Sequence, residues 1–90
     1  MKRLVIDVYG YVQGVFFRYT TRKIARKLGL TGYVKNMPNG SVHIVAEGPE
    51  SDLKELLEFS KKGPRNARVD KVEHIFHEAK GTYKGFDYKF

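Results

Sequence analysis

The stretch Tyr33-Val34-Lys35-Asn36-Met37-Pro38-Asn39-Gly40-Ser41-Val42-His43-Ile44-Val45-Ala46-Glu47 indicates the fold most directly. In its middle, Pro38 suits the first corner of a type I turn, and the following Asn-Gly supplies the positive φ that closes a hairpin. We therefore expect antiparallel neighbouring strands at residues 33–36 and 41–47. In the second strand, apolar residues alternate with a set expected on the exposed side, namely His43, Val45 and Glu47.

Before this hairpin the chain predicts a strand, a loop and a helix. Residues 4–9 indicate a strand whose buried face carries Leu4, Ile6 and Val8. A loop between two glycines, residues 10–14, follows it. Apolar residues then keep helical spacing over residues 17–28, and Gly29 stands where a left-handed cap would end that helix.

After the hairpin a second helix is expected to open at residues 48–50, with acidic residues in its first turn that complement the helix dipole. Its buried stripe is Leu53, Leu56 and Leu57. Residues 69–76 predict a fourth strand, whose apolar phase shifts between Val69 and Val72 and so suggests a bulge. Residues 85–90 alternate aromatic and polar side chains, which favours a short final strand.

The resulting order, β-α-β-β-α-β, is that of the split βαβ or ferredoxin-like arrangement. We expect an α+β sandwich in which two helices share one face of an antiparallel four-stranded sheet, with the short C-terminal strand added. A chain of 90 residues leaves room for one domain, residues 1–90.

The net charge of +7 favours anionic partners such as phosphorylated metabolites or nucleic acid. The absence of cysteine excludes disulfides, thiolate nucleophiles, zinc ribbons and iron–sulfur clusters, and fits a cytoplasmic protein. No apolar run reaches the length of a signal peptide core or of a transmembrane helix, so no membrane association is expected.

The segment Gly10-Tyr11-Val12-Gln13-Gly14-Val15-Phe16-Phe17-Arg18 is a turn that contains glycine and runs from a strand into a helix N-terminus. Consecutive N–H groups in such a turn can form a nest for an anion, and the free N–H groups of the helix add positive potential. Arg18 places a positive charge at the N-terminus of the predicted helix, where the helix dipole is also positive. This arrangement is unfavourable by about 0.3 to 1 kcal/mol unless an anion lies between the two. The alternative is a simple connector with Arg18 pointing outward.

The second candidate is Asn36, at the end of a predicted strand. Asparagine at such a position commonly caps the adjoining turn, and on the bare sequence this structural role is favoured. The functional alternative is an amide that holds a water molecule beside a substrate.

Taken together, the two segments resemble the two signatures of the acylphosphatase family. The first is Gly-x-Val-Gln-Gly-Val-x-Phe-Arg at residues 10–18, and the second is Gly-Tyr-Val-Lys-Asn-x-x-x-Gly-x-Val followed by glycine, at residues 32–48. The resemblance covers the whole chain. It implies that Asn36 orients the attacking water and that the phosphoryl group is bound by Arg18 together with the backbone of Gln13, Gly14, Val15, Phe16, Phe17 and Arg18.

The resemblance also implies the reaction, which is hydrolysis of small acyl phosphates to a carboxylate and inorganic phosphate. A carboxylate is a good leaving group, so positioning and charge stabilisation suffice, without a metal, a cofactor or a covalent phosphoenzyme. Inorganic phosphate and sulfate are expected to bind as competing anions. The same domain opens larger hydrogenase-maturation proteins, but this chain ends where the domain ends, which favours a small free-standing acylphosphatase. The acyl group and the oligomeric state remain open, although a monomer is expected.

Other interpretations are weaker. His74 and His77 are three residues apart on a predicted strand, so their side chains project from opposite faces of the sheet and cannot bind one metal ion together. Tyr11, Phe16 and Phe17 are expected to pack, and the alternative is that they contact the acyl group. An RNA-binding module would share this topology and the basic charge. Such modules stack RNA bases on aromatic residues of the two central strands, and the third strand here carries no aromatic residue on its exposed side. Binding of nucleic acid is therefore not expected. A regulatory domain of this fold would leave Arg18 and Asn36 unexplained.

Overall fold

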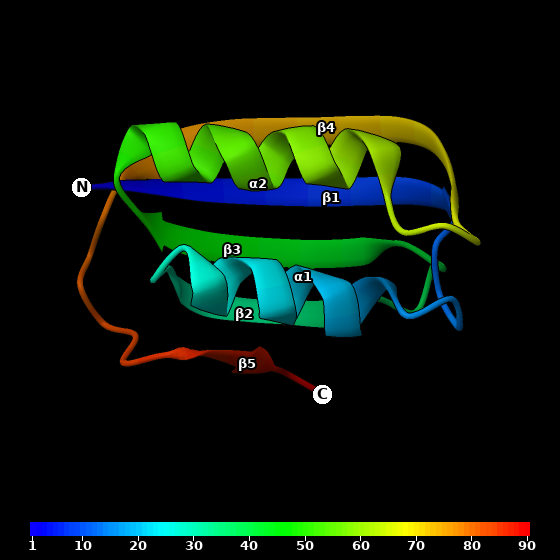
Figure 1. The fold of residues 1–90 in the computed structure, drawn as a ribbon, viewed down its shortest axis with the longest axis horizontal. Helices are drawn as coiled ribbons and strands as arrows, with labels where there is room; N and C mark the ends of the chain where they lie inside the picture. Colours follow the sequence, from blue (N-terminus) through cyan, green and yellow to red (C-terminus); the bar gives the residue numbers. More distant parts are fainter.

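Two helices cover one face of a five-stranded sheet in the computed structural model, which describes residues 1–90 (Figure 1). The strand order is β4-β1-β3-β2-β5. The first four strands are antiparallel to their neighbours, and β5 runs parallel to β2. The expected ferredoxin-like α+β fold is confirmed. The elements are β1 (Lys2–Tyr11), α1 (Phe17–Lys27), β2 (Thr31–Asn36), β3 (Val42–Gly48), α2 (Glu50–Lys62), β4 (Arg68–Glu78) and β5 (Phe86–Tyr88).

The predicted hairpin joins β2 to β3. The backbone N–H of Gly40 donates to the carbonyl oxygen of Met37 at 3.0 Å, and Met37 N–H donates to Ser41 at 2.9 Å. Gly40 has a φ of 91°, so the turn closes where glycine was expected to allow it. Asn36 lies opposite Val42 in the register, at the last pair before the turn.

The core lies between the sheet and the two helices. Alternate residues of β1, including Ile6, are fully buried, as are Ile44 of β3 and Leu53 of α2. The ring of Phe17, at the start of α1, lies 5.5 Å from that of Phe59 on α2 and joins the two helices. The expected buried stripes of the first strand and of the second helix are confirmed.

The predicted bulge lies in β4. Tyr9 pairs with Lys71, whereas the next residue, Gly10, pairs with Val69, so Asp70 has no opposite partner. Gly10 has a φ of 136°, and a β-carbon there would overlap the carbonyl oxygen of Arg68. Only glycine fits this close approach, which directs the end of β1 into the loop before α1.

The face of the sheet opposite the helices is not open along β3, contrary to the sequence-based expectation. Val45 and Glu47 are each only 5 % exposed, and His43 is half-buried. The carboxylate of Glu47 accepts hydrogen bonds from Arg3 Nε at 2.7 Å and from the N–H groups of Lys80 and Gly81 at 3.0 Å each. The segment between β4 and β5 therefore covers this end of the face. Alternation along a strand assigns residues to faces but does not reveal what covers them.

Candidate active site

The loop from Val12 to Phe16 is fixed to the body of the protein at three points. The side chains of Val12 and Val15 are buried in the core. Between them, the side-chain amide of Gln13 donates to the carbonyl oxygens of Met37 and Ser41, at 2.9 Å each. Gly14 and Phe16 both have left-handed backbone conformations, with φ of 76° and 65°. The two left-handed residues curve the loop, and the contacts of Gln13 hold it against the β2–β3 hairpin.

The backbone N–H groups from Gly14 to Arg18 donate no hydrogen bond within the protein. The first intrahelical donor is Thr20, whose N–H lies 3.0 Å from the carbonyl oxygen of Phe16. Helix α1 also lacks a side-chain N-cap and has no acidic residue in its first turn. Free donors at a helix start, with a left-handed residue beside them, are the geometry in which backbone binds oxyanions.

Arg18 and Asn36 line one cavity of about 420 Å³. Arg18 projects from the first turn of α1 and forms no ion pair; the ion pairs of this helix belong to Arg22 and Arg26, which contact Asp87 at 3.0 and 3.4 Å. A guanidinium without a carboxylate partner, beside free N–H donors, makes this cavity favourable for an anion.

Asn36 reaches the cavity because it lies two residues beyond the buried Val34 on β2, on the face that the helices cover. Its side-chain oxygen is buried and has no hydrogen-bond partner. The turn is capped instead by Asn39, whose Oδ1 accepts from the N–H of Ser41 at 3.0 Å and from its hydroxyl at 2.6 Å. The capping role considered for Asn36 thus belongs to Asn39, and the Asn36 oxygen is left without a structural function.

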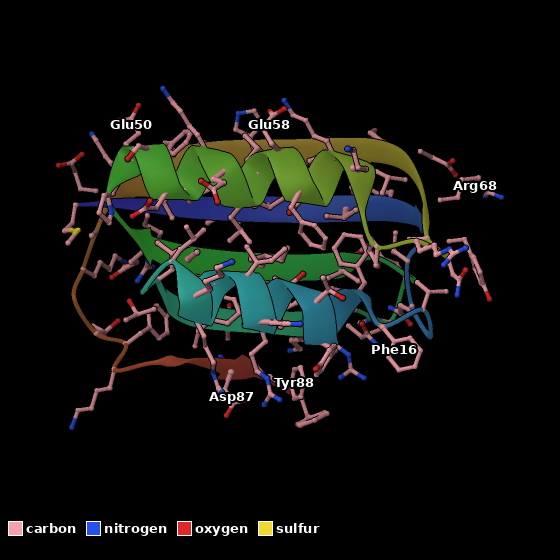
Figure 2. All side chains as sticks on the ribbon, in the orientation of Figure 1. Phe16, Glu50, Glu58, Arg68, Asp87 and Tyr88 are labelled. Carbon is pink, nitrogen blue, oxygen red and sulfur yellow. The ribbon has the colours of Figure 1, made fainter.

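The C-terminal segment also lines the cavity, which the sequence did not indicate. Tyr88 and Phe90 line the cavity, and the rings of both lie 5.6 Å from the guanidinium carbon of Arg18. Figure 2 shows Phe16 at the start of α1 and Tyr88 beside the same helix. The alternating aromatics of residues 86–90 were a signal, but they indicated a strand only. Their proximity to the loop depends on the parallel pairing of β5 with β2, which the sequence did not specify.

The C-terminal strand is tied to α1 by polar contacts. Asp87 pairs with Arg22 and accepts from the N–H of Tyr88 at 2.8 Å, and these contacts, the backbone one foremost, hold the pKa of the Asp87 carboxyl below its usual range. Arg26 Nε donates to the carbonyl oxygen of Phe86 at 2.8 Å. These contacts hold the strand where its aromatic side chains meet the cavity.

Two aromatic predictions were wrong and one was right. Phe17 packs in the core, as expected, but Tyr11 and Phe16 are 57 % and 74 % exposed and do not pack.

The two histidines of β4, His74 and His77, lie opposite Ile6 and Arg3 in the register, hence on different faces of the sheet. No three His, Cys, Asp or Glu side chains are grouped so that they could hold a metal ion.

A family model described as acylphosphatase matches residues 4–88. The chain belongs to the acylphosphatase family. An acylphosphatase of Caldanaerobacter subterraneus subsp. tengcongensis is 51 % identical over 87 residues, which are 96 % of this chain and 97 % of that protein. The crystal structure of acylphosphatase from Bacillus subtilis superimposes with a TM-score of 0.95, at 36 % identity and full coverage of both chains. A full-length HypF, in its phosphate- and nucleotide-bound form, contains a similar unit: the TM-score is 0.89 at 31 % identity, over 99 % of this chain and 12 % of HypF.

This acylphosphatase is thus a hydrolase that acts on acyl phosphates. Membership of the family agrees with the two motifs and with the fold, both of which the sequence had indicated. Neither of the two helices has the length and hydrophobicity needed to cross a membrane.

Proposed function

We propose that this acylphosphatase binds the phosphoryl group of its substrate with Arg18 and the backbone of Gln13 to Arg18, and that Asn36 orients the attacking water. The observation that carries this assignment is the shared cavity, which brings an unpaired guanidinium and an unpaired amide oxygen together from two elements. Free N–H groups of the loop complete the set of donors. An amide oxygen that accepts a hydrogen bond from water aligns that water for attack on phosphorus.

The chemistry needs little more than this arrangement. The leaving group is a carboxylate, which departs at neutral pH without a strong acid. Charge on the peripheral phosphoryl oxygens in a loose transition state is stabilised by fixed donors, here the guanidinium and the loop amides. The chain has no cysteine, and none of its three histidines lines the cavity, which supports direct attack by water rather than a covalent phosphoenzyme.

Inorganic phosphate and sulfate are expected to compete for the same donors, because each presents the oxygen geometry of the transferred group. We further propose that residues 1–90 act as one monomeric catalytic domain in the cytoplasm. The net charge of +7 supports the monomer through mutual repulsion, and the absence of cysteine is compatible with a reducing compartment.

A phosphate titration followed by NMR tests the location of the site. The largest amide shifts are expected at Gly14 to Arg18, and phosphate should inhibit hydrolysis competitively. Sulfate should give the same pattern. Shifts confined to the exposed Lys61 and Lys62, at the end of α2, would contradict the proposal.

A further inference from the structure

Half of the large apolar side chains that the protein exposes to solvent line the cavity. Six such residues are exposed in the whole chain, and three of them, Phe16, Tyr19 and Phe90, line this one cavity. Their exposed fractions are 74 %, 51 % and 91 %. Exposed aromatic groups that converge on a binding cavity, rather than scatter over the surface, indicate an apolar ligand group.

The backbone of Phe16, beside the cavity, has a conformation that phenylalanine does not favour. Phe16 is the one residue other than glycine with a positive φ, 65°, and its ring is not packed. A left-handed conformation at a bulky residue costs of the order of 1 kcal/mol or more, and glycine would adopt it without strain. Neither the local backbone conformation nor packing explains why a phenyl ring stands at position 16, whereas contact of the ring with a ligand does.

The C-terminal residues Tyr88 and Phe90 form another part of the cavity wall. The N–H of Lys89 donates to the carbonyl oxygen of Val34 at 3.0 Å, which extends the pairing of β5 toward Phe90. Tyr88 is held by Arg22, whose guanidinium carbon lies 4.2 Å from the ring centroid. Phe16 and the strand aromatics therefore flank Arg18 from two separate elements.

The volume also exceeds the needs of a phosphoryl group. A cavity of about 420 Å³ falls in the range of sites that hold whole organic ligands, of roughly 300 to 1,000 Å³. Six of its nine lining residues are apolar or aromatic. The polar residues Arg18 and Asn36 suit the phosphoryl end of a substrate, and the aromatic rim suits its other end.

We propose that Phe16, Tyr19 and Phe90 form an acyl subsite, and that the enzyme selects acyl phosphates whose acyl group is aromatic or bulky and apolar over those with a small acyl group. This inference rests on the proposed function, because it takes Arg18 as the point where the phosphoryl group is bound. The acyl group then lies against the rings while the phosphoryl group faces the loop.

Two matched inhibitors test the subsite without turnover: phenacylphosphonate and acetonylphosphonate, in which a methylene replaces the bridging oxygen of benzoyl and acetyl phosphate. The wild-type enzyme is expected to bind the phenyl compound about tenfold more tightly. This ratio should fall several-fold in Phe16→Gly, which removes the ring and relieves the backbone, and in Tyr19→Ser/Phe90→Ser. The matched control is Tyr11→Ser, because Tyr11 is an exposed aromatic outside the cavity; its ratio should equal that of the wild type.

A wild-type ratio near one would overturn the inference, as would a ratio that survives in both Phe16→Gly and Tyr19→Ser/Phe90→Ser. The melting temperature of each variant establishes whether it is folded. The two variants change different residues, so if one of them does not fold, the other still tests the subsite. Failure of the underlying phosphate site has a separate signature: inorganic phosphate would not displace either phosphonate. Displacement with no preference for the phenyl compound overturns the acyl subsite alone.

Discussion

The side-chain amide of Gln13 donates to the carbonyl oxygen of Met37 at 2.9 Å, and the same nitrogen donates to Ser41. One side chain thereby fixes the loop that precedes α1 to the turn that follows Asn36. The two halves of the proposed site come from segments some twenty residues apart in sequence, and this contact sets their separation.

Gln13→Ala should therefore lower kcat by about tenfold, because loss of registry between loop and hairpin misplaces the attacking water relative to the phosphoryl group. Two hydrogen bonds are lost, so the free energy of unfolding should fall by about 1 to 2 kcal/mol, which lowers the melting temperature by several degrees. Steady-state kinetics and thermal denaturation measure both effects. A variant with normal kcat and reduced stability would show that the contact holds the fold only.

Glu47 should make the stability of the protein dependent on pH at the acid end. Burial alone would raise the pKa of its carboxyl, but hydrogen bonds from Lys80, Arg3 and Gly81 outweigh burial and hold the pKa below the ordinary value of 4.5. A lowered pKa in the folded state means stability that is present above pH 4.5 and is lost as the pH falls through the folded value.

Glu47→Gln provides the matched comparison, because it keeps the shape and removes the charge. At pH 7 the variant should be less stable by about 2 kcal/mol, the scale of hydrogen bonds to a charged group. The difference in melting temperature between the two proteins should narrow as the pH falls below 4.5, because the unfolded wild-type chain then binds a proton at Glu47 that the folded carboxylate does not yet bind. A difference that stays constant from pH 7 to pH 3 would contradict this account of Glu47.

Hydrolysis is expected to proceed without a divalent metal. The proposed donors are a guanidinium, an amide and backbone N–H groups, none of which is a good metal ligand, and the carboxylate leaving group needs no Lewis acid. Release of phosphate from benzoyl phosphate should be the same before and after addition of a chelator. Activity that disappears with the chelator and returns with magnesium would count decisively against this mechanism.

The sequence predicted the fold well because its local signals agreed with one another. The hairpin turn at residues 37–40, the glycine after α1 and the leucine stripe of α2 each correspond to the structure. The bulge was visible as a shift in the apolar phase of β4. The covering of Glu47 was not predictable, because it depends on a segment without regular pattern that returns from β4 to β5.

The site was predictable to the extent that it lies in contiguous motifs. Arg18 and Asn36 stand in such segments, whereas Tyr88 and Phe90 join them only through the pairing of β5 with β2. The exposure of Phe16 was missed because composition favours packed aromatics, and a left-handed backbone at phenylalanine is not visible in sequence. The choice between two roles for Asn36 required the hydrogen bonds of Asn39.

Arg18→Ala should weaken both phosphate binding and turnover, because the guanidinium contacts the phosphoryl oxygens in the ground state and in the transition state alike. The inhibition constant for phosphate should rise about tenfold or more, and kcat/KM should fall by about 10² to 10³. Unchanged inhibition by phosphate would mean that Arg18 points away from the anion.

The most direct test of the central claim compares Asn36→Ala with Asn39→Ala. Asn36→Ala should lower kcat by about 10²-fold and leave the inhibition constant for phosphate and the melting temperature nearly unchanged, because its buried oxygen has no partner to lose. Asn39→Ala should do the opposite: it keeps kcat and loses about 1 kcal/mol of stability with its two bonds to Ser41. A folded Asn36→Ala enzyme with near-normal kcat would contradict the assignment of the attacking water to this residue.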